Sequence, residues 1–299
     1  TPEREMPPNT ARIIQSNYTT SIKRSDPNKA AKLIGVHTAI TQQMNTELQY
    51  IIKKTKKLIP AFLKCSATFH EIWILYTTVL IPSLCFSMPA VTFTEEQTKS
   101  IQDQYMPTIL KKAGFGKGYP EAVIYGDKQF QGHNFYHLKA IHIAAQVQYL
   151  VKHIQANDYI GFTARSMINW AQHNAGTKNP LLMTHDCVTH LEGKWINKLR
   201  EDLKKINGTI YICDVWTLPS TRENDQHIMD FISQVIQSPT LRRKINYCRL
   251  YLHIMHISDI TTSDGKQLHP TMLLNYPTKL GNQLHTLQWP VQPKLNKLT

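Results

Sequence analysis

An uncharged stretch from Ile72 to Thr94 limits most strongly how this chain can fold. Its length would suffice to cross a bilayer, so its residues must lie either in lipid or in a protein core. Pro82 and Pro89 interrupt the stretch, and hydroxyl-bearing residues dilute it. We therefore expect a buried helix that ends at Pro82, then an extended segment, and no membrane partner.

Apolar residues recur at helical spacing over residues 46–59, which predicts an amphipathic helix. Pro60 is expected to kink or end this helix. Lys53 and Lys57 lie opposite the apolar residues, and Lys54 and Lys56 flank them. Such a basic face is either solvated or laid on phosphate, and the pattern alone leaves both readings open.

Capping signals predict the start of three further helices. Thr68-x-x-Glu71 and Thr94-x-x-Gln97 have the spacing of a capping box. Ser238-Pro239 combines a good N-cap with proline at the first helical position. Helical spacing also predicts helices over residues 138–155, 162–175, 190–206 and 228–236.

Several short runs predict strands. Residues 122–125 and 209–216 are rich in β-branched and aromatic side chains. Residues 257–262, followed by Asp264-Gly265, predict a β-hairpin. The run Lys32-Leu-Ile-Gly-Val36 predicts a strand at which another chain segment approaches Gly35 closely. The chain should therefore be mostly α, in the α+β class, with a helical domain that carries a short β-hairpin.

The charge balance points to a polyanionic partner. Lys and Arg number 34 against 21 Asp and Glu, a formal net charge of +13. Nucleic acid is the commonest partner of so basic a chain and an anionic membrane surface the next, while a merely basic protein is the alternative. Five widely spaced cysteines indicate a reducing compartment. We expect an intracellular protein, in the cytoplasm and nucleus.

Catalytic and metal-binding patterns are weak. A polymerase needs clustered carboxylates on metal ions, and the chain contains no Asp-Asp pair. Asp186 with Glu192-Gly-Lys194 mimics a nuclease motif, but the separation is too short. His185, Cys187 and His190 lack the second pair of ligands that zinc normally takes. We therefore expect no catalytic residue, metal ligand or cofactor in this chain.

Basic residues interleaved with aromatic ones remain as the binding signature. Lysine and arginine neutralise phosphates, and aromatic rings can stack on bases. Besides the lysines of residues 46–59, the candidate nucleic-acid-binding residues are Lys194, Lys198, Arg242, Arg243, Lys244 and Arg249.

A set of motifs resembles the region beyond the catalytic palm of non-long-terminal-repeat retroelement reverse transcriptases. The run 32–36 resembles the glycine strand that follows the palm, and residues 46–64 resemble the lysine-rich helical thumb after it. The later motifs are Pro82-Ser-Leu-Cys-Phe86, Leu110-Lys-Lys-Ala-Gly-Phe115, Pro120-Glu-Ala-Val-Ile-Tyr-Gly126, Leu191-Glu-Gly-Lys-Trp195, Arg249-Leu-Tyr-Leu252 and Ser258-Asp-Ile-Thr-Thr-Ser-Asp-Gly265.

The resemblance implies three parts: a residual palm strand and loop over 1–44, a helical thumb-like module over 45–112 and a C-terminal helical domain over 113–299. It also implies that the palm, with carboxylates for Mg²⁺, is missing from this piece of an RNA-directed DNA polymerase. Gly35 would then lie near the primer end, and Lys53, Lys54 and Lys57 along the template–primer backbone.

The expected function is therefore to hold template–primer or element RNA without a polymerase active site. Two alternatives stay open: a stand-alone, non-enzymatic nucleic-acid-binding adaptor, and the inactive remnant of a retroelement. The sequence leaves the oligomeric state and the preference for RNA or DNA undecided.

Overall fold

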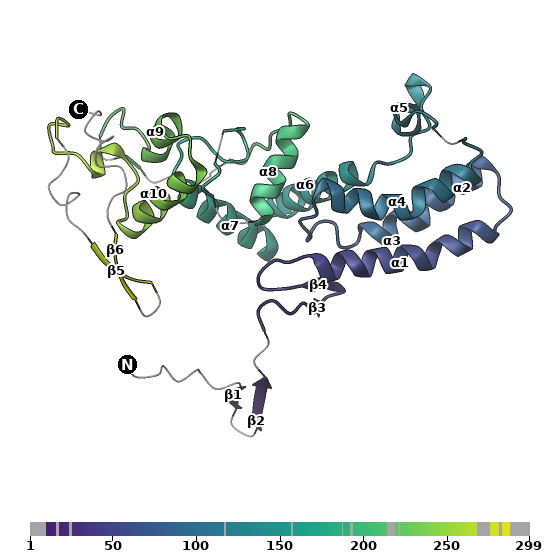
Figure 1. Ribbon diagram of the computed structural model, residues 1–299, viewed down its shortest axis with the longest axis horizontal. Coiled ribbons are helices and arrows are strands. Elements are labelled where there is room, and N and C mark those ends of the chain that lie inside the picture. Colours follow the sequence, from purple (N-terminus) through teal and green to yellow (C-terminus); the bar gives the residue numbers. More distant parts are fainter. Residues whose placement is uncertain are drawn as a thin grey trace. The chain divides into compact units, whose positions relative to one another are not determined.

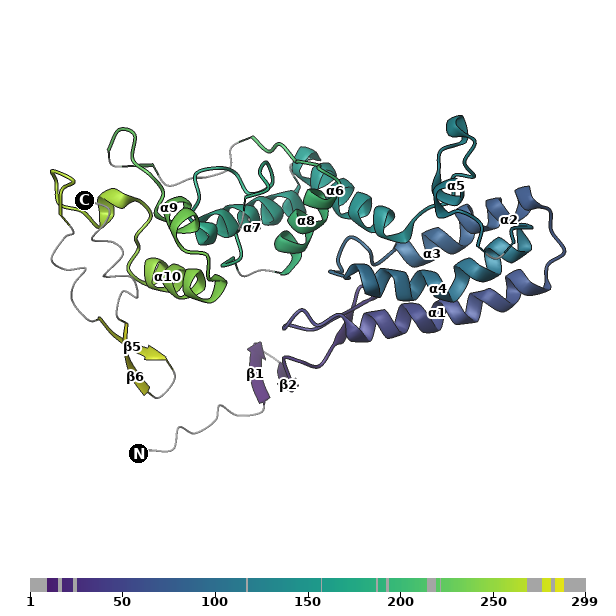
Figure 2. The same ribbon diagram turned by 45° about the horizontal axis from the view of Figure 1, so that its top comes forward.

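The computed structural model is mostly helical with short antiparallel hairpins (Figures 1 and 2), which confirms the predicted mostly α, α+β class. The chain folds as two compact units, Thr1–His142 and Ile143–Thr299. Residues 113–142 therefore belong to the first unit, and the predicted three-part division stays a prediction. The structure describes residues 10–15, 18–23, 26–116, 118–156, 158–186, 188–191, 194–213, 219–220, 222–267, 276–280 and 283–287.

Three two-stranded antiparallel sheets are present in the described residues. In the first unit, β1 (Thr10–Gln15) pairs with β2 (Tyr18–Lys23). In the second unit, β5 (Tyr276–Leu280) pairs with β6 (Gln283–Leu287). Each pairs strands that are neighbours in sequence, so these sheets need no long-range connection.

The third sheet pairs β3 (Ala31–Leu33) with β4 (Val36–Thr38) through a two-residue turn. Ile34 and Gly35 form this turn and have φ values of 48° and 92°. Positive φ at both central residues matches the twist of a tight hairpin. The prediction of one strand over residues 32–36 is therefore wrong, because the chain reverses at its centre.

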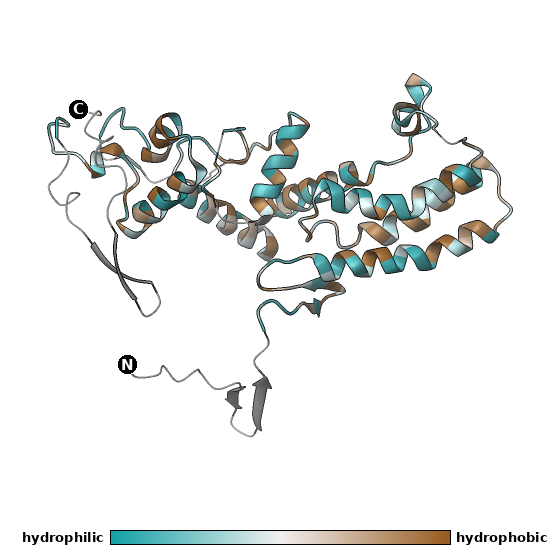
Figure 3. Ribbon diagram, viewed as in Figure 1, coloured by the Kyte–Doolittle hydropathy of each residue, from teal (hydrophilic) through white to brown (hydrophobic). Residues whose placement is uncertain are grey.

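The first unit is built around α1 (Asn45–Lys64), which packs against α4 (Glu95–Lys112). Hydrophobic and hydrophilic residues alternate along α1 in Figure 3, as an amphipathic helix requires. Each fully buried Ile or Phe contributes about 1.5–3 kcal/mol through loss of apolar surface from water. The buried side chains of α1 are Glu47, Ile51, Thr55, Ile59 and Phe62.

Pro60 lies inside α1, and the expectation that the helix would end there is wrong. Proline removes one intrahelical donor, so the carbonyl of Lys56 loses its partner. Pro60 is exposed, and water can therefore hydrogen-bond to that carbonyl. The backbone N–H of Cys65 donates to the Ala61 carbonyl oxygen at 3.2 Å, so regular bonding continues beyond the proline.

The first part of the uncharged stretch lies in three consecutive helical pieces: α2 (Phe69–Leu75), the π-helical turn η1 (Tyr76–Leu80) and α3 (Ile81–Cys85). Its remaining residues, 86–94, form a turn and then an irregular segment that leads to α4. The expected end at Pro82 is wrong. Pro82 lies in the first turn of α3, where the missing N–H disturbs least. No helix in the described part of the chain is long and apolar enough to cross a membrane. Fully buried here are Ile72, Tyr76, Leu80 and Met88.

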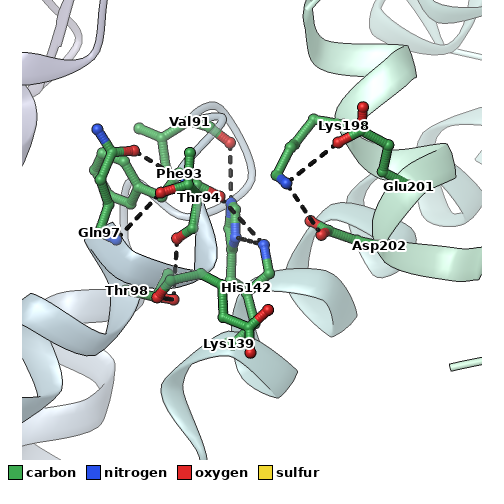
Figure 4. Close-up of polar contacts among 11 residues, drawn as sticks. Val91, Phe93, Thr94, Gln97, Thr98, Lys139, His142, Lys198, Glu201 and Asp202 are labelled. Carbon is green, nitrogen blue, oxygen red and sulfur yellow. Dashed lines mark hydrogen bonds and ion pairs between the residues drawn. The ribbon is translucent and has the colours of Figure 1, made fainter. Parts of the chain in front are cut away.

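Both predicted capping boxes are confirmed. The Thr94 Oγ1 atom accepts from the Gln97 N–H at 3.2 Å, and Gln97 Oε1 accepts from the Thr94 N–H at 2.9 Å (Figure 4). Thr68 and Glu71 make the same reciprocal pair at the start of α2. These caps satisfy donors that the first turn of a helix leaves free.

Two buried polar side chains fasten α6 (Leu138–Ala156) to the segment before α4. Lys139 Nζ donates to the Phe93 carbonyl oxygen at 3.2 Å, and His142 Nε2 donates to the Val91 carbonyl oxygen at 3.0 Å (Figure 4). Both side chains are buried, so these bonds offset the cost of removing polar groups from water.

Residues 121–125 form the helix α5 (Glu121–Tyr125), so the predicted strand there is wrong. Pro120 begins the turn, and its carbonyl accepts from the Val123 and Ile124 N–H groups at 3.0 and 3.1 Å. A strand needs a partner for its backbone groups, whereas this turn satisfies them locally. A short 3₁₀ helix, η2 (Lys128–Phe130), follows.

The second unit contains α7 (Tyr159–Ala175), α8 (Lys194–Lys205), α9 (Ile228–Val235) and α10 (Pro239–Tyr251). Gly176 ends α7 in the left-handed conformation, with φ 63°, and Ser238 caps α10, as predicted. One apolar cluster joins α7 and α8, and a second joins α9 and α10. The first includes Ile168, Ala171, Leu199 and Leu203, and the second Ile228, Ile232, Ile245 and Ile254.

Two other predicted β segments of this unit lack the expected strand in their described residues. Residues 209–213 form no strand. Among the described residues, the Ile210 N–H donates to the Leu182 carbonyl oxygen at 2.8 Å. Residues 214–216 of this prediction lie outside the described residues.

In place of the first strand of the hairpin expected at residues 257–265, the 3₁₀ helix η3 (Ile257–Asp259) is formed. The Asp259 carboxylate accepts hydrogen bonds from the Met255 and His256 N–H groups, which precede η3, and these bonds stabilise the helical turn. The predicted turn is present, because the Gly265 N–H donates to the Thr262 carbonyl oxygen and the Thr262 N–H to the Gln267 carbonyl oxygen, both at 2.8 Å. Residues 268–275 lie outside the described residues.

Candidate nucleic-acid interface

Four lysines on α1 face solvent on the side opposite its buried residues. Lys53, Lys56, Lys57 and Lys64 are all exposed, whereas the apolar face of the helix packs against α4. The helix thus fixes both faces at once: burial of the isoleucines orients the lysines outward. Within the residues that the structure describes, these four ammonium groups have no hydrogen-bond or ion-pair partner.

No acidic group offsets this charge along the helix. Glu47 is the single acidic residue of α1, and it is buried. Its carboxylate accepts two hydrogen bonds from His37, one from the backbone N–H and one from the ring Nδ1, both at 2.8 Å. Lys53 and Lys57 are one turn apart, and like charges at that spacing destabilise a helix by a few tenths of a kcal/mol. A polyanion laid along the helix would relieve that repulsion.

Lys32 and Tyr50 extend the basic face toward the start of α1. Lys32 Nζ lies 5.4 Å from the centre of the Tyr50 ring, a cation–π contact. Tyr50 precedes Lys53 by three residues, so both lie on one side of the helix. The rise from Tyr50 to Lys64 is about 21 Å at 1.5 Å per residue. We call the set Lys32, Tyr50, Lys53, Lys56, Lys57 and Lys64 the basic strip.

Lys54 does not belong to the basic strip, although it was predicted to contact nucleic acid. It is half-buried, and its Nζ donates to the Ser83 carbonyl oxygen, next to Pro82. This bond ties α1 to α3. Lys54 therefore has a structural partner that its three exposed neighbours lack.

Gly35, the other predicted residue of this unit, lies at the tip of the β3–β4 turn. A Cβ atom at this position would lie 3.0 Å from Phe86 Cε1, so only glycine fits without a shift. The predicted close approach of another chain segment is thus made by the Phe86 ring. Neighbouring Ile34 is 95 % exposed. The His37–Glu47 bonds attach this hairpin to the first turn of α1.

Of the two lysines predicted on α8, Lys198 contributes little free charge. Lys198 Nζ lies 3.4 Å from both the Glu201 and the Asp202 carboxylates (Figure 4). Asp202 is fully buried, so Lys198 serves to compensate it. Lys194 is the first residue of α8, and its side chain lies outside the described residues.

Arg249 is a buried structural residue and not part of a surface patch. Its Nη2 donates to the carbonyl oxygens of His173 and Asn174 at 2.9 and 2.8 Å, and its Nε to Asn246 Oδ1 at 3.0 Å. Burial lowers the pKa of the guanidinium to about 10, so it stays charged at neutral pH. Gly176 leaves room for it, because a Cβ there would lie 2.7 Å from Arg249 Cζ.

The other predicted residues of α10 separate into one buried and two exposed side chains. Arg242 is 4 % exposed, and its Nη2 donates to the Ser233 carbonyl oxygen at 2.8 Å. Arg243 and Lys244 are exposed. The predicted second patch is therefore reduced to these two residues, because the helix turns Arg242 and Arg249 toward the core.

Sequence reasoning missed three members of the basic strip, Lys32, Tyr50 and Lys64, and it placed Lys56 on the basic face without naming it as a contact residue. The sequence predicts that the helix ends at Pro60, and Lys64 lies four residues beyond that point. The contact of Lys32 with Tyr50 depends on the hairpin folding back on α1, which a single predicted strand does not suggest. The available signal was the spacing of Tyr50, Lys53 and Lys57, which places an aromatic ring in line with the lysines.

No cluster of three or more His, Cys, Asp or Glu side chains that could hold a metal ion occurs among the residues described. Comparison with known proteins adds no relative: no protein-family model, no curated protein and no solved structure matches this chain. The basic strip therefore stands on its own geometry.

Proposed function

We propose that this chain binds the phosphate backbone of a nucleic acid duplex through the basic strip on α1. The carrying observation is the row of exposed lysines Lys53, Lys57 and Lys64 without an acidic partner in the described part of the chain. The net charge of +13 supports the same class of partner.

The dimensions of the strip fit a duplex. Its rise of about 21 Å equals the axial rise of about six phosphates on one strand of a duplex, at 3.4 Å each. Lysine contacts phosphate as a mobile point charge, which gives affinity without base readout. Tyr50 adds an aromatic surface at one end of the row, where an unpaired base or a sugar could pack.

The resemblance to retroelement reverse transcriptases, with a template–primer held by an intracellular protein in the cytoplasm and nucleus, is one setting for this activity. In that setting the turn at Gly35 would face the primer end and the palm would supply the Mg²⁺ chemistry. A stand-alone adaptor would use the same strip, since neither reading requires a catalytic group in this chain.

A matched pair of charge-reversal variants tests the proposal. Lys53, Lys57 and Lys64 are changed together to Glu in the full chain, and binding to a fluorescent primed duplex is followed by anisotropy. We expect the affinity to fall roughly tenfold or more, because three phosphate contacts are lost. In the control, Lys29, Lys99 and Lys111, which are equally exposed lysines elsewhere in the first unit, are changed to Glu.

The control lowers the net charge by the same amount, so it distinguishes binding by this particular surface from binding through the overall positive charge. Near-normal binding of the control with loss in the α1 variant supports the basic strip. Equal loss in both variants would show that the overall charge, and not this surface, binds nucleic acid.

A further inference from the structure

We propose that a cavity in the second unit, between α8, residues 185–186 and 188–191 and the first two turns of α10, binds a nucleoside phosphate. Its volume is about 480 Å³, within the range of about 300–1,000 Å³ in which small-molecule pockets fall. All of its lining residues belong to the second unit, so this site is separate from the basic strip and does not rest on it.

The spacing of α8 explains how one wall of the cavity forms. Asn197, Arg200 and Lys204 lie at intervals of three and four residues and line the cavity. Leu199 and Leu203, on the other side of the helix, are buried in the core. The same burial that anchors α8 therefore turns its polar side chains toward the cavity.

Hydrogen bonds from α8 hold the opposite wall in place. Arg200 Nε donates to the Leu181 carbonyl oxygen at 2.7 Å, and its Nη2 to those of Thr184 and Asp186 at 3.3 and 2.8 Å. Lys204 Nζ lies 3.4 Å from the His185 carbonyl oxygen. The backbone of residues 181–186 is thus fixed by the helix, and the cavity is formed before any ligand arrives.

The charge in the cavity favours an anion. Arg200, Lys204 and Arg243 supply three positive charges against the carboxylates of Asp186 and Glu201. Lys198, which does not line the cavity, lies 3.4 Å from the Glu201 carboxylate and at the same distance from the buried Asp202 carboxylate, so its charge is shared between the two (Figure 4). The balance that remains is positive.

Arg243 is the group best placed to hold a phosphate. It is exposed, it lines the cavity from α10, and its guanidinium has no partner among the residues that the structure describes. The planar fork of arginine matches two phosphate oxygens at once. The basic patch predicted on this helix thus contributes one side chain to a cavity wall.

The rest of the cavity suits a nucleoside better than a bare anion. Val188, Leu191 and Pro239 give apolar surface against which a base or sugar can pack. Asn197 Nδ2 donates to the Leu191 carbonyl oxygen at 2.7 Å. Its amide oxygen has no partner in the described part of the chain and can accept from an exocyclic amine of a base.

Calorimetric titration of the full chain tests the site, with adenosine 5′-monophosphate, adenosine and inorganic phosphate as probes. We expect the monophosphate to bind roughly tenfold more tightly than adenosine, because the charged hydrogen bonds of Arg243 require the phosphate. Arg243→Glu and Arg243→Gln should both lose that difference. Lys244→Glu, the neighbouring exposed residue that does not line the cavity, is the control and should retain it.

Equal binding of adenosine and its monophosphate, or equal effects of Arg243→Glu and Lys244→Glu, would overturn the proposal. Inorganic phosphate that binds as tightly as the monophosphate would also overturn it, since the apolar wall would then contribute nothing. A trinucleotide with and without a 5′-phosphate identifies the source of the ligand: preference for the phosphorylated form assigns a strand end, and binding of the mononucleotide alone a free nucleotide.

The lysine variant of the basic strip separates this site from the proposed function. Lys53, Lys57 and Lys64 lie in the first unit, so their change to Glu should leave monophosphate binding unaltered. Loss of duplex binding with retained monophosphate binding is the expected result for that variant. Monophosphate binding that disappears with it would assign the nucleotide to the basic strip and overturn the cavity as its site.

Discussion

Replacement of Arg249 by alanine should destabilise the second unit strongly, although arginine is usually a surface residue. The side chain is fully buried in α10. Its guanidinium donates to the carbonyl oxygens of His173, Asn174 and Ile254 and to Asn246 Oδ1, at 2.8–3.4 Å. Alanine removes the donors and leaves these four acceptors in the interior.

The size of the effect follows from those acceptors. An acceptor stranded in the interior costs about 1–3 kcal/mol. Water can enter the space that the guanidinium vacates, so the lower end applies to each of the four. We therefore expect a loss of about 4 kcal/mol in the free energy of unfolding, or about 10 °C in the melting temperature of a unit of this size.

Urea unfolding followed by circular dichroism measures the change, and Arg243→Ala is the matched control. Arg243 is the same residue type on the same helix, but it is exposed, so its replacement should change stability by no more than about 0.5 kcal/mol. Similar stability of the two variants would show that the guanidinium of Arg249 does not hold α10 to the end of α7.

Three further predictions concern stability. Burial lowers the pKa of His190 to about 4 in the folded state, whereas a histidine in the unfolded chain has a pKa of about 6.5. As the pH falls, protons therefore bind first to the unfolded chain, and the free energy of unfolding should fall by up to about 3 kcal/mol between pH 6.5 and 4. Urea titrations over this pH range should show a flatter dependence for His190→Gln. Gly35→Ala, with φ 92° and Phe86 3.0 Å away, should cost more than about 1 kcal/mol, whereas Gly116→Ala, with open space around it, should not; equal costs would contradict the turn geometry. Thr94→Ala should lower stability by about 1 kcal/mol through loss of the α4 cap, measured by thermal melting against Thr92→Ala, and an unchanged melting temperature would mean that the cap is not formed.

Helices with a local start signal could be predicted from the sequence. Thr68, Thr94 and Ser238 cap their helices through side-chain bonds to residues three positions later, and such bonds depend on nothing distant. Gly176 ends α7 for an equally local reason, since it adopts positive φ. The sequence therefore contained most of the information on these helices.

The strand predictions failed because a strand depends on its partner. Residues 122–125 have β-branched and aromatic side chains, yet Pro120 starts a helical turn that satisfies their backbone groups. Residues 209–213 have similar composition, but within the part of the chain that the structure describes their backbone bonds once to another segment, from the Ile210 N–H to the Leu182 carbonyl oxygen. Composition reports suitability for a sheet, and only the rest of the fold decides whether a neighbouring strand exists.

In the candidate site, too, local features could be predicted from the sequence and features that depend on distant residues could not. The outward face of α1 followed from its period, so Lys53 and Lys57 could be identified. Arg249 could not be separated from Arg243 by sequence, because its acceptors at His173 and Asn174 are about 75 residues away along the chain. Which basic residues are free for a ligand is therefore a property of the tertiary structure.

The salt dependence of duplex binding tests the basic strip most directly. The affinity of the full chain and of a variant with Lys53, Lys57 and Lys64 changed to Gln is measured for one primed duplex over a range of salt concentrations. Each phosphate contact contributes about 0.9 to the slope of log affinity against log salt. If the strip contacts phosphates, the variant's slope should be shallower by about 2.7. Equal slopes for the two proteins would contradict the assignment of this surface to nucleic acid.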